Sequence, residues 1–145
     1  MDEALYTTWA PRLVRFCANL LRNAHDAEEV VQDVFTKLLA TEDRYALDAN
    51  PGVLLYRLAR NRCIDHRRKH RPEPLAEREP VARTENRDLE DALLALTFEE
   101  REVLLLTVQD GLTYRDVAQI LGCSVGTVAA RKYAAVEELK RRLAP

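Results

Sequence analysis

Cationic side chains and one amide gather in a single short stretch of this sequence. Between Arg57 and Arg71, seven arginines and lysines stand against one acid, Asp65. Guanidinium and ammonium groups neutralise phosphates, so a row of them on a helix is typical of nucleic-acid binding. The stretch also contains Asn61, whose carboxamide carries both a donor and an acceptor. The sequence therefore predicts a basic face on a helix.

Further along the chain, residues 111–143 have the layout of a helix-turn-helix. Ala118 precedes Gly122 by four positions, and a small residue there lets two helices cross closely around a glycine turn. Ser124 is a typical N-cap for the second helix. In such motifs the start of the second helix contacts base edges, while amides and cations hold phosphates. An ordinary helical hairpin is the alternative interpretation.

The second helix of this motif is poor in cations. The candidates for DNA contact in and before it are Thr113, Ser124, Gly126, Thr127, Arg131 and Lys132. Alanine occupies positions 129, 130, 134 and 135, where a DNA-reading helix usually carries cations. Alanine contacts a thymine methyl but neutralises no phosphate, and each missing phosphate contact lowers the salt slope by about 0.9. We expect residues 88–145 alone to bind DNA weakly.

Other chemistries have little support. Cys63, His66 and His70 fall on one predicted helix, and two histidines four apart can hold zinc. The flanking arginines oppose a cation and the ligand set is incomplete, so no metal or other cofactor is expected. No glycine-rich phosphate loop or nucleophile–base pair stands out, so an enzyme is not predicted. The cysteines, Cys17, Cys63 and Cys123, are odd in number and show no paired pattern, which favours reduced thiols in a cytoplasmic protein.

The elements that must position these residues are predicted to be helices. Apolar residues recur at spacings of three and four, and strand-like alternation is absent. Capping signals precede the predicted helices: Asp26 with Glu29, Asn50 before Pro51, Thr97 with Glu100, Thr113 with Asp116, and Ser124. The fold class is therefore all-α.

The charge pattern divides the chain. After the basic stretch, residues 72–91 hold seven acids against three arginines, with prolines at 72, 74 and 80. We therefore expect two small helical domains, 1–71 and 88–145, joined by a flexible linker over 72–87. The net charge of −2 excludes a generic polyanion binder. No signal peptide or membrane-spanning stretch is apparent, so a cytoplasmic protein without membrane insertion is expected.

Both halves together resemble one family. "DAEEVVQDVFTKLL" followed by "NPGVLLYRLARNRCIDHRRK" is similar to region 2 of the extracytoplasmic-function (group IV) bacterial sigma factors. "LTFEEREVLLLTVQDGLTYRDVAQILGCSVGTVAAR" is similar to region 4 of the same family. The two motif sets occur in the family's order with a linker between them. The resemblance implies a dissociable sigma subunit that binds bacterial RNA polymerase core and directs transcription from particular promoters.

The resemblance also implies roles for individual residues. The acidic helix of region 2 would dock on the polymerase clamp through Asp26, Glu28, Glu29, Gln32 and Asp33; a solvated acidic face is the alternative. The promoter −10 element would meet Arg57, Arg60, Asn61, Arg67, Arg68 and Lys69. An unstacked base would enter a pocket formed partly by residues 41–50, where Tyr45 is the stacking candidate. The −35 element would contact the candidate residues of the helix-turn-helix, from Thr113 to Lys132.

The implied partners are the polymerase core, promoter DNA and an anti-sigma factor. The chain departs from the family's usual pattern, with Leu54 where tryptophan is common and Lys132 where an apolar residue is common. A sigma-like decoy, which binds an anti-sigma factor or core polymerase without starting transcription, is the second hypothesis. A DNA-binding regulator without polymerase contact is the third.

Overall fold

The computed structural model describes residues 3–41, 50–69 and 87–144, so Tyr45 and most of the predicted linker lie outside it. The chain divides into two compact units, Met1–Val81 and Ala82–Pro145. Within the described ranges every element is helical and no strand occurs, in agreement with the all-α prediction. None of the described helices combines the length and apolar character needed to cross a membrane.

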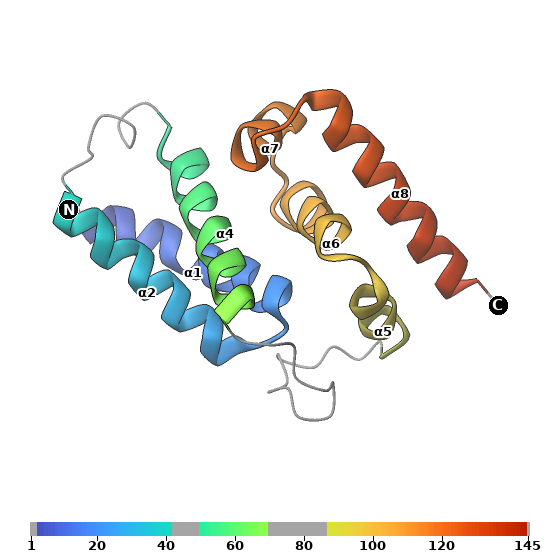
Figure 1. Cartoon of the computed structure of the whole chain (residues 1–145), viewed down its shortest axis with the longest axis horizontal. Helices are drawn as coiled ribbons and strands as arrows, with labels where there is room; N and C mark the ends of the chain where they lie inside the picture. The colour runs from blue at the N-terminus through green and yellow to red at the C-terminus, as the bar shows by residue number, and fades with distance from the viewer. Residues whose placement is uncertain (1–2, 42–49, 70–86, 145) are drawn as a thin grey trace. The chain divides into compact units, whose positions relative to one another are not determined.

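In the first unit, α1 (Glu3–Leu21), α2 (Ala24–Thr41) and α4 (Pro51–Lys69) pack against one another (Figure 1). Tyr56 of α4 is fully buried, and its ring lies edge-on to Phe16 at 5.5 Å between centroids. Both residues belong to an apolar core that also contains Leu13, Leu20, Val30, Val31, Val34, Phe35, Leu55 and Ala59. Burying these side chains is the main source of stability for so small a bundle.

The starts of α2 and α4 are set by asparagine caps. The side-chain oxygen of Asn23 accepts the amide of Asp26 at 3.0 Å, so α2 begins at Ala24. The predicted capping box of Asp26 with Glu29 is therefore wrong. Asn50 accepts the amide of Val53 at 3.3 Å and is followed by a proline in the first helical position, which confirms the predicted start of α4.

In the second unit, α8 (Val125–Leu143) runs along α5 (Arg87–Ala95), α6 (Phe98–Leu104) and α7 (Tyr114–Leu121), as Figure 1 shows. The helix begun by α6 continues as a π-helical turn, Leu105–Gln109, which the sequence did not predict. Ala135 of α8 is fully buried beside Leu96 and Leu104. That alanine therefore belongs to the core and not to a DNA-facing surface.

Predicted caps in the second unit are confirmed. Thr97 and Glu100 form a reciprocal capping box, with bonds of 3.0 and 3.1 Å. Thr113 accepts the amide of Asp116 at 3.1 Å and so begins α7. Between α7 and α8, Gly122 adopts φ +69°, a left-handed conformation that favours glycine, and its amide donates to the Ala118 carbonyl. The helix-turn-helix is thus present, with the glycine where the turn requires it.

Candidate nucleic-acid and partner interfaces

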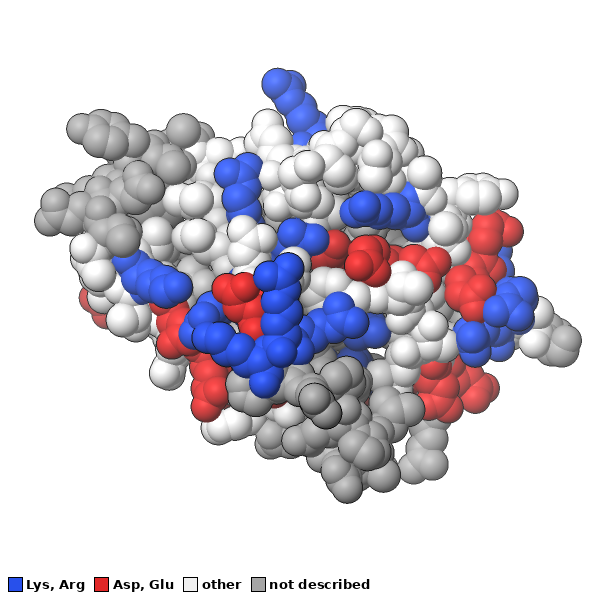
Figure 2. Space-filling view, in the orientation of Figure 1, with Lys and Arg blue, Asp and Glu red and all other residues white. Residues whose placement is uncertain are grey.

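The basic face of α4 carries most of the residues predicted for the −10 element. Arg57, Asn61 and Arg68 are exposed and recur at spacings of four and seven, so they share one face of the helix. Arg67 and Lys69 are exposed in the last turn, where cations also stabilise the negative end of a helix. Lysines and arginines gather over this end of α4 in Figure 2. The arrangement can hold several phosphates along one strand.

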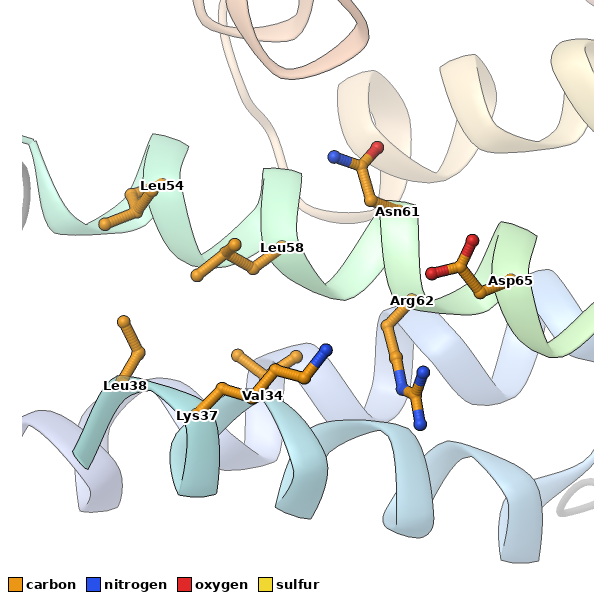
Figure 3. Close-up of a pocket in the computed structure, with 8 residues that line it drawn as sticks. All are labelled: Val34, Lys37, Leu38, Leu54, Leu58, Asn61, Arg62 and Asp65. Atoms are coloured by element: carbon orange, nitrogen blue, oxygen red, sulfur yellow. The ribbon is translucent and has the colours of Figure 1, made fainter. Parts of the chain in front are cut away.

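A pocket opens beside this face, between α2 and α4, with a volume of about 300 Å³. Leu54 and Leu58 of α4 lie opposite Val34 and Leu38 of α2 and make its apolar walls (Figure 3). Its polar lining consists of Asn61, Lys37, Arg62 and Asp65. The carboxamide of Asn61 also accepts a long bond of 3.4 Å from the Arg60 guanidinium. An apolar slot with an amide and cations on its lining suits a flat, polar-edged group such as a base.

Sequence reasoning found Asn61 but not the rest of this lining. Lys37, Leu38 and Val34 come from the helix that was predicted to bind polymerase, and nothing local in the sequence relates them to α4. The spacing of residues in the sequence could have indicated this lining. Asp26, Asp33 and Lys37 are spaced by seven and four, which places them on one edge of α2. That edge faces α4.

Two ion pairs join the same edge of α2 to α4. The guanidinium of Arg62 donates from Nε and Nη2 to Oδ2 of Asp33, at 3.2 and 2.8 Å. One turn further along α4, Nε2 of His66 lies 3.0 Å from a carboxylate oxygen of Asp26. The His66 and Asp26 side chains are only 15% and 28% exposed, so this pair is well shielded from water. His66, weighed above as a zinc ligand, is thus occupied by a carboxylate.

The five residues predicted to meet polymerase therefore lie on different sides of α2. Asp26 and Asp33 face α4, as described. Glu28 and Gln32 are exposed and line an open groove between α1 and α2, with Tyr6, Pro11 and Arg15 among its other lining residues. Glu29 points outward and lies 3.4 Å from His25, four residues before it. The outward surface of α2 thus contains Glu28, Glu29 and Gln32.

The start of α8 contains most of the −35 candidates. Ser124 caps the helix by accepting the Thr127 amide at 3.1 Å, and the two hydroxyls lie 2.9 Å apart. Ser124 and Gly126 are exposed and Thr127 is half-buried. Thr113, exposed, caps the preceding helix. This end of α8 therefore presents hydroxyl groups and backbone, which can contact phosphate or base edges.

The cations and alanines of α8 divide between its faces. Lys132 is directed at α7: its ammonium lies 5.1 Å from the centre of the Tyr114 ring. Arg131 is half-buried, whereas Ala130 and Ala134 are exposed. Beside them Tyr133 is 69% exposed, an aromatic residue that sequence reasoning did not select. Between Val125 and Ala134 the exposed residues of α8 are therefore small or apolar, apart from the ring of Tyr133.

Comparison with known proteins identifies the family. The model of Sigma-70 region 2 matches residues 5–73, and that of Sigma-70 region 4 matches residues 86–139. The extracytoplasmic-function (ECF) RNA polymerase sigma factor EcfG of Rhodopseudomonas palustris (strain TIE-1) is 31% identical over 132 residues, which cover 83% of this chain and 73% of that protein. This chain belongs to the ECF sigma factors. The family resemblance inferred from the sequence is confirmed.

Other members and solved structures agree. SigW of Bacillus subtilis (strain 168), an ECF sigma factor, is 28% identical over 91% of this chain and 83% of its own length. The sigma factor RpoE, solved with the anti-sigma factor NepR from Bartonella quintana, superposes with a TM-score of 0.79 at 27% identity, over 95% of this chain and 93% of that one. CnrH, solved with the cytosolic domain of CnrY, gives a TM-score of 0.77 at 26% identity, over 97% and 85%.

In this ECF sigma factor the first unit is the region 2 part and the second is the region 4 part. The basic face of α4 and the pocket beside it belong to region 2, and the helix-turn-helix belongs to region 4. The roles of individual side chains at these surfaces stay predictions. The exact ends of the domains and linker also stay predictions.

Proposed function

We propose that this protein binds bacterial RNA polymerase core and directs promoter-specific transcription initiation. The outward surface of α2 meets the polymerase, the face of α4 holds the melted −10 strand, and the start of α8 contacts the −35 element. Family membership supports the overall role. The sigma subunit selects and opens the promoter, and we assign it no catalytic step of its own. Because the polymerase and chromosome share the cytoplasm, the proposed role places the protein there.

One observation carries the −10 assignment: the pocket between α2 and α4 opens beside a row of exposed cations on the same helix. A base that leaves the stack needs an apolar slot for its faces and polar groups for its edge. Leu54 and Leu58 supply the former, and Asn61 supplies a donor and an acceptor. Phosphates on either side of that base would lie near the cationic face. Backbone and base contacts then come from a single helix.

The test uses holoenzyme, formed from the full-length protein and saturating core, on forked promoter DNA. The DNA series carries each of the four bases in turn at every single-stranded −10 position. We expect one position to be strongly selective and Asn61→Ala to weaken that selectivity, since a base contact contributes about 1–3 kcal/mol. Arg68→Ala is the matched control on the same face: it should weaken binding of all four DNAs alike and lower the salt slope.

If Asn61→Ala weakens all four DNAs equally at every position, the pocket does not read a base. If holoenzyme does not form at all, the polymerase assignment itself is wrong. These two outcomes are measured separately, by binding to fork DNA and by co-sedimentation with core.

For region 4 we propose a weak −35 contact. Exposed Ala130 and Ala134 leave few cations on the outer face of α8, and Lys132 lies against Tyr114. Scrambling the −35 sequence should therefore reduce promoter binding by the holoenzyme less than scrambling the −10 sequence does. A −35 scramble that abolishes binding would contradict this ranking.

We also propose that an anti-sigma factor regulates the protein. The support is the likeness to RpoE and CnrH, two proteins solved with NepR and with the cytosolic domain of CnrY. An anti-sigma factor would compete with core polymerase, so its addition should release the protein from holoenzyme. Cross-linking of the full-length protein in its own cells, followed by mass spectrometry, would identify the competitor.

The exposed alanines of α8 favour one other candidate function, that of a decoy which binds an anti-sigma factor or core without starting transcription. Run-off transcription with purified core on a genomic fragment library separates the two. A sigma factor gives transcripts with defined start sites, and a decoy gives none while still binding core or the competitor.

A further inference from the structure

We propose that Asp33 is a positioning residue of the −10 pocket and acts through Arg62. The family resemblance suggested Asp33 as a polymerase contact, but its carboxylate points to α4. This inference rests on the proposed function of the pocket. It states that Asp33 determines where the Arg62 side chain lies in the pocket lining. Helix α2 would then both contact polymerase through its outward surface and position a side chain of the DNA-binding pocket.

The geometry of the pair supports this role. Two guanidinium nitrogens of Arg62, Nε and Nη2, donate to the same oxygen of Asp33, Oδ2, at 3.2 and 2.8 Å. Charge-assisted bonds of this kind are stronger and more directional than neutral ones. The Arg62 side chain is 29% exposed and that of Asp33 is 49% exposed. Figure 3 shows Arg62 extending from α4 toward α2 at one end of the pocket.

The consequence concerns where the Arg62 guanidinium would go without its partner. Asp65 lies three residues further along α4 and lines the same pocket. Residues at this spacing are neighbours on a helix surface, and opposite charges attract there. If the Asp33 carboxylate were absent, Arg62 would turn toward Asp65 and bring its cation into the pocket. A base in the pocket would then contact the Arg62 guanidinium in a different position, and the base preference would change.

The second ion pair supports the same arrangement. His66 lies one turn beyond Arg62 on α4, and Asp26 lies about two turns before Asp33 on α2; the two are 3.0 Å apart and shielded from water. Together the two pairs connect α2 to α4 at two successive levels beyond the apolar part of the pocket. The guanidinium of Arg62, at one end of the pocket, is therefore anchored by a carboxylate of α2.

The experiment is a double-mutant cycle measured as base selectivity. Preformed holoenzyme, at saturating core, binds the four fork DNAs that differ at the selective −10 position. Asp33→Asn and Arg62→Gln should each reduce the ratio between the preferred base and the others by about two- to fivefold, the range for a partly exposed ion pair. The double variant should be no worse than Arg62→Gln alone, because Asp33 acts through that residue. Asp33→Glu keeps the carboxylate and should retain most of the selectivity.

Base selectivity separates positioning from simple loss of fold, since a destabilised bundle weakens binding to all four DNAs in proportion. Additive losses in the double variant, or a selectivity ratio that stays at the wild-type value in both single variants, would overturn the inference. Asn61→Ala in the same assay isolates the proposed function. If that variant loses selectivity while the Asp33 and Arg62 variants keep it, only the positioning role is wrong. If none of them changes it, the pocket is not the reading site.

Discussion

The packing of Trp9 on Gly52 gives a sharp stability prediction. A Cβ added at Gly52 would lie 2.7 Å from Cη2 of Trp9, which is closer than van der Waals contact allows. The ring has limited freedom to move, because it also lies edge-on to Tyr56, with centroids 6.4 Å apart, and under the Arg12 guanidinium at 4.7 Å. Gly52→Ala should therefore push α1 away from the start of α4.

The size of the effect follows from two opposing terms. Replacing glycine by alanine in a helix gains about 1 kcal/mol, and less than that in a first turn. Overpacking a well-filled contact costs about 1–3 kcal/mol. The clash with a rigid ring should win, so we expect Gly52→Ala to lower the free energy of unfolding of the first unit by about 1–2 kcal/mol.

Urea unfolding followed by tryptophan fluorescence measures this change. Trp9 is the only tryptophan in the chain, so the signal reports on region 2. Gly126→Ala is the matched control, because the Cβ there meets only the Ser124 hydroxyl oxygen, at 3.8 Å. Followed by circular dichroism, that variant should be as stable as the wild type or up to about 1 kcal/mol more stable.

A further variant tests the cause. Trp9→Leu removes the ring, so adding Gly52→Ala to it should cost much less than the same change in the wild type. If Gly52→Ala leaves the wild-type bundle as stable as before, or stabilises it, the close contact with Trp9 does not govern this site. The reasoning about the α1–α4 packing would then fail.

Three other predictions concern α8. Ser124→Ala removes the N-cap and should destabilise the second unit by about 1 kcal/mol, measured by circular dichroism in urea. Ala134→Arg, at an exposed position, should strengthen promoter binding and steepen its salt slope by about 0.9; an unchanged slope would mean that this face does not meet DNA. Hydrogen bonds from Arg141 and then Arg142 lower the pKa of the Glu138 carboxyl below its ordinary 4.5. The stabilisation of the helix end is therefore complete above pH 4.5 and lost as pH falls through the lowered value. The protection factors of the amides there, which correct for the intrinsic exchange rate at each pH, should fall in acid, and Glu138→Gln should abolish that fall.

Much of the fold is encoded in local sequence. The caps at Asn50, Thr97, Thr113 and Ser124 form as predicted, because each bond joins residues three positions apart and needs no other part of the chain. The predicted cap at Asp26 is wrong for an equally local reason. The side-chain oxygen of Asn23, three residues earlier, accepts the Asp26 amide, so the helix already includes Asp26.

The features that were not predicted depend on how each helix is rotated about its axis when it packs against its neighbours. Ala135 was grouped with the other alanines of α8, but the packing of α6 buries it and leaves Ala134 exposed. Asp33 was grouped with Gln32, but rotation about α2 turns one toward α4 and the other toward α1. A difference of one residue is about 100° on a helix, so a motif read as a string cannot assign its members to faces.

The pairing of acids with α4 also bears on why this protein needs its polymerase. Of the cations in the described part of α4, Arg62 bonds to Asp33, and the predicted phosphate contacts are Arg57, Arg60, Arg67, Arg68 and Lys69. Five contacts with a single strand give a salt slope of about −3.5, at about 0.7 for each phosphate. Such a surface holds a strand only weakly at cellular salt, and the outer face of α8 adds few cations. Polymerase contacts must supply the remaining binding energy, so a free molecule has little tendency to occupy DNA.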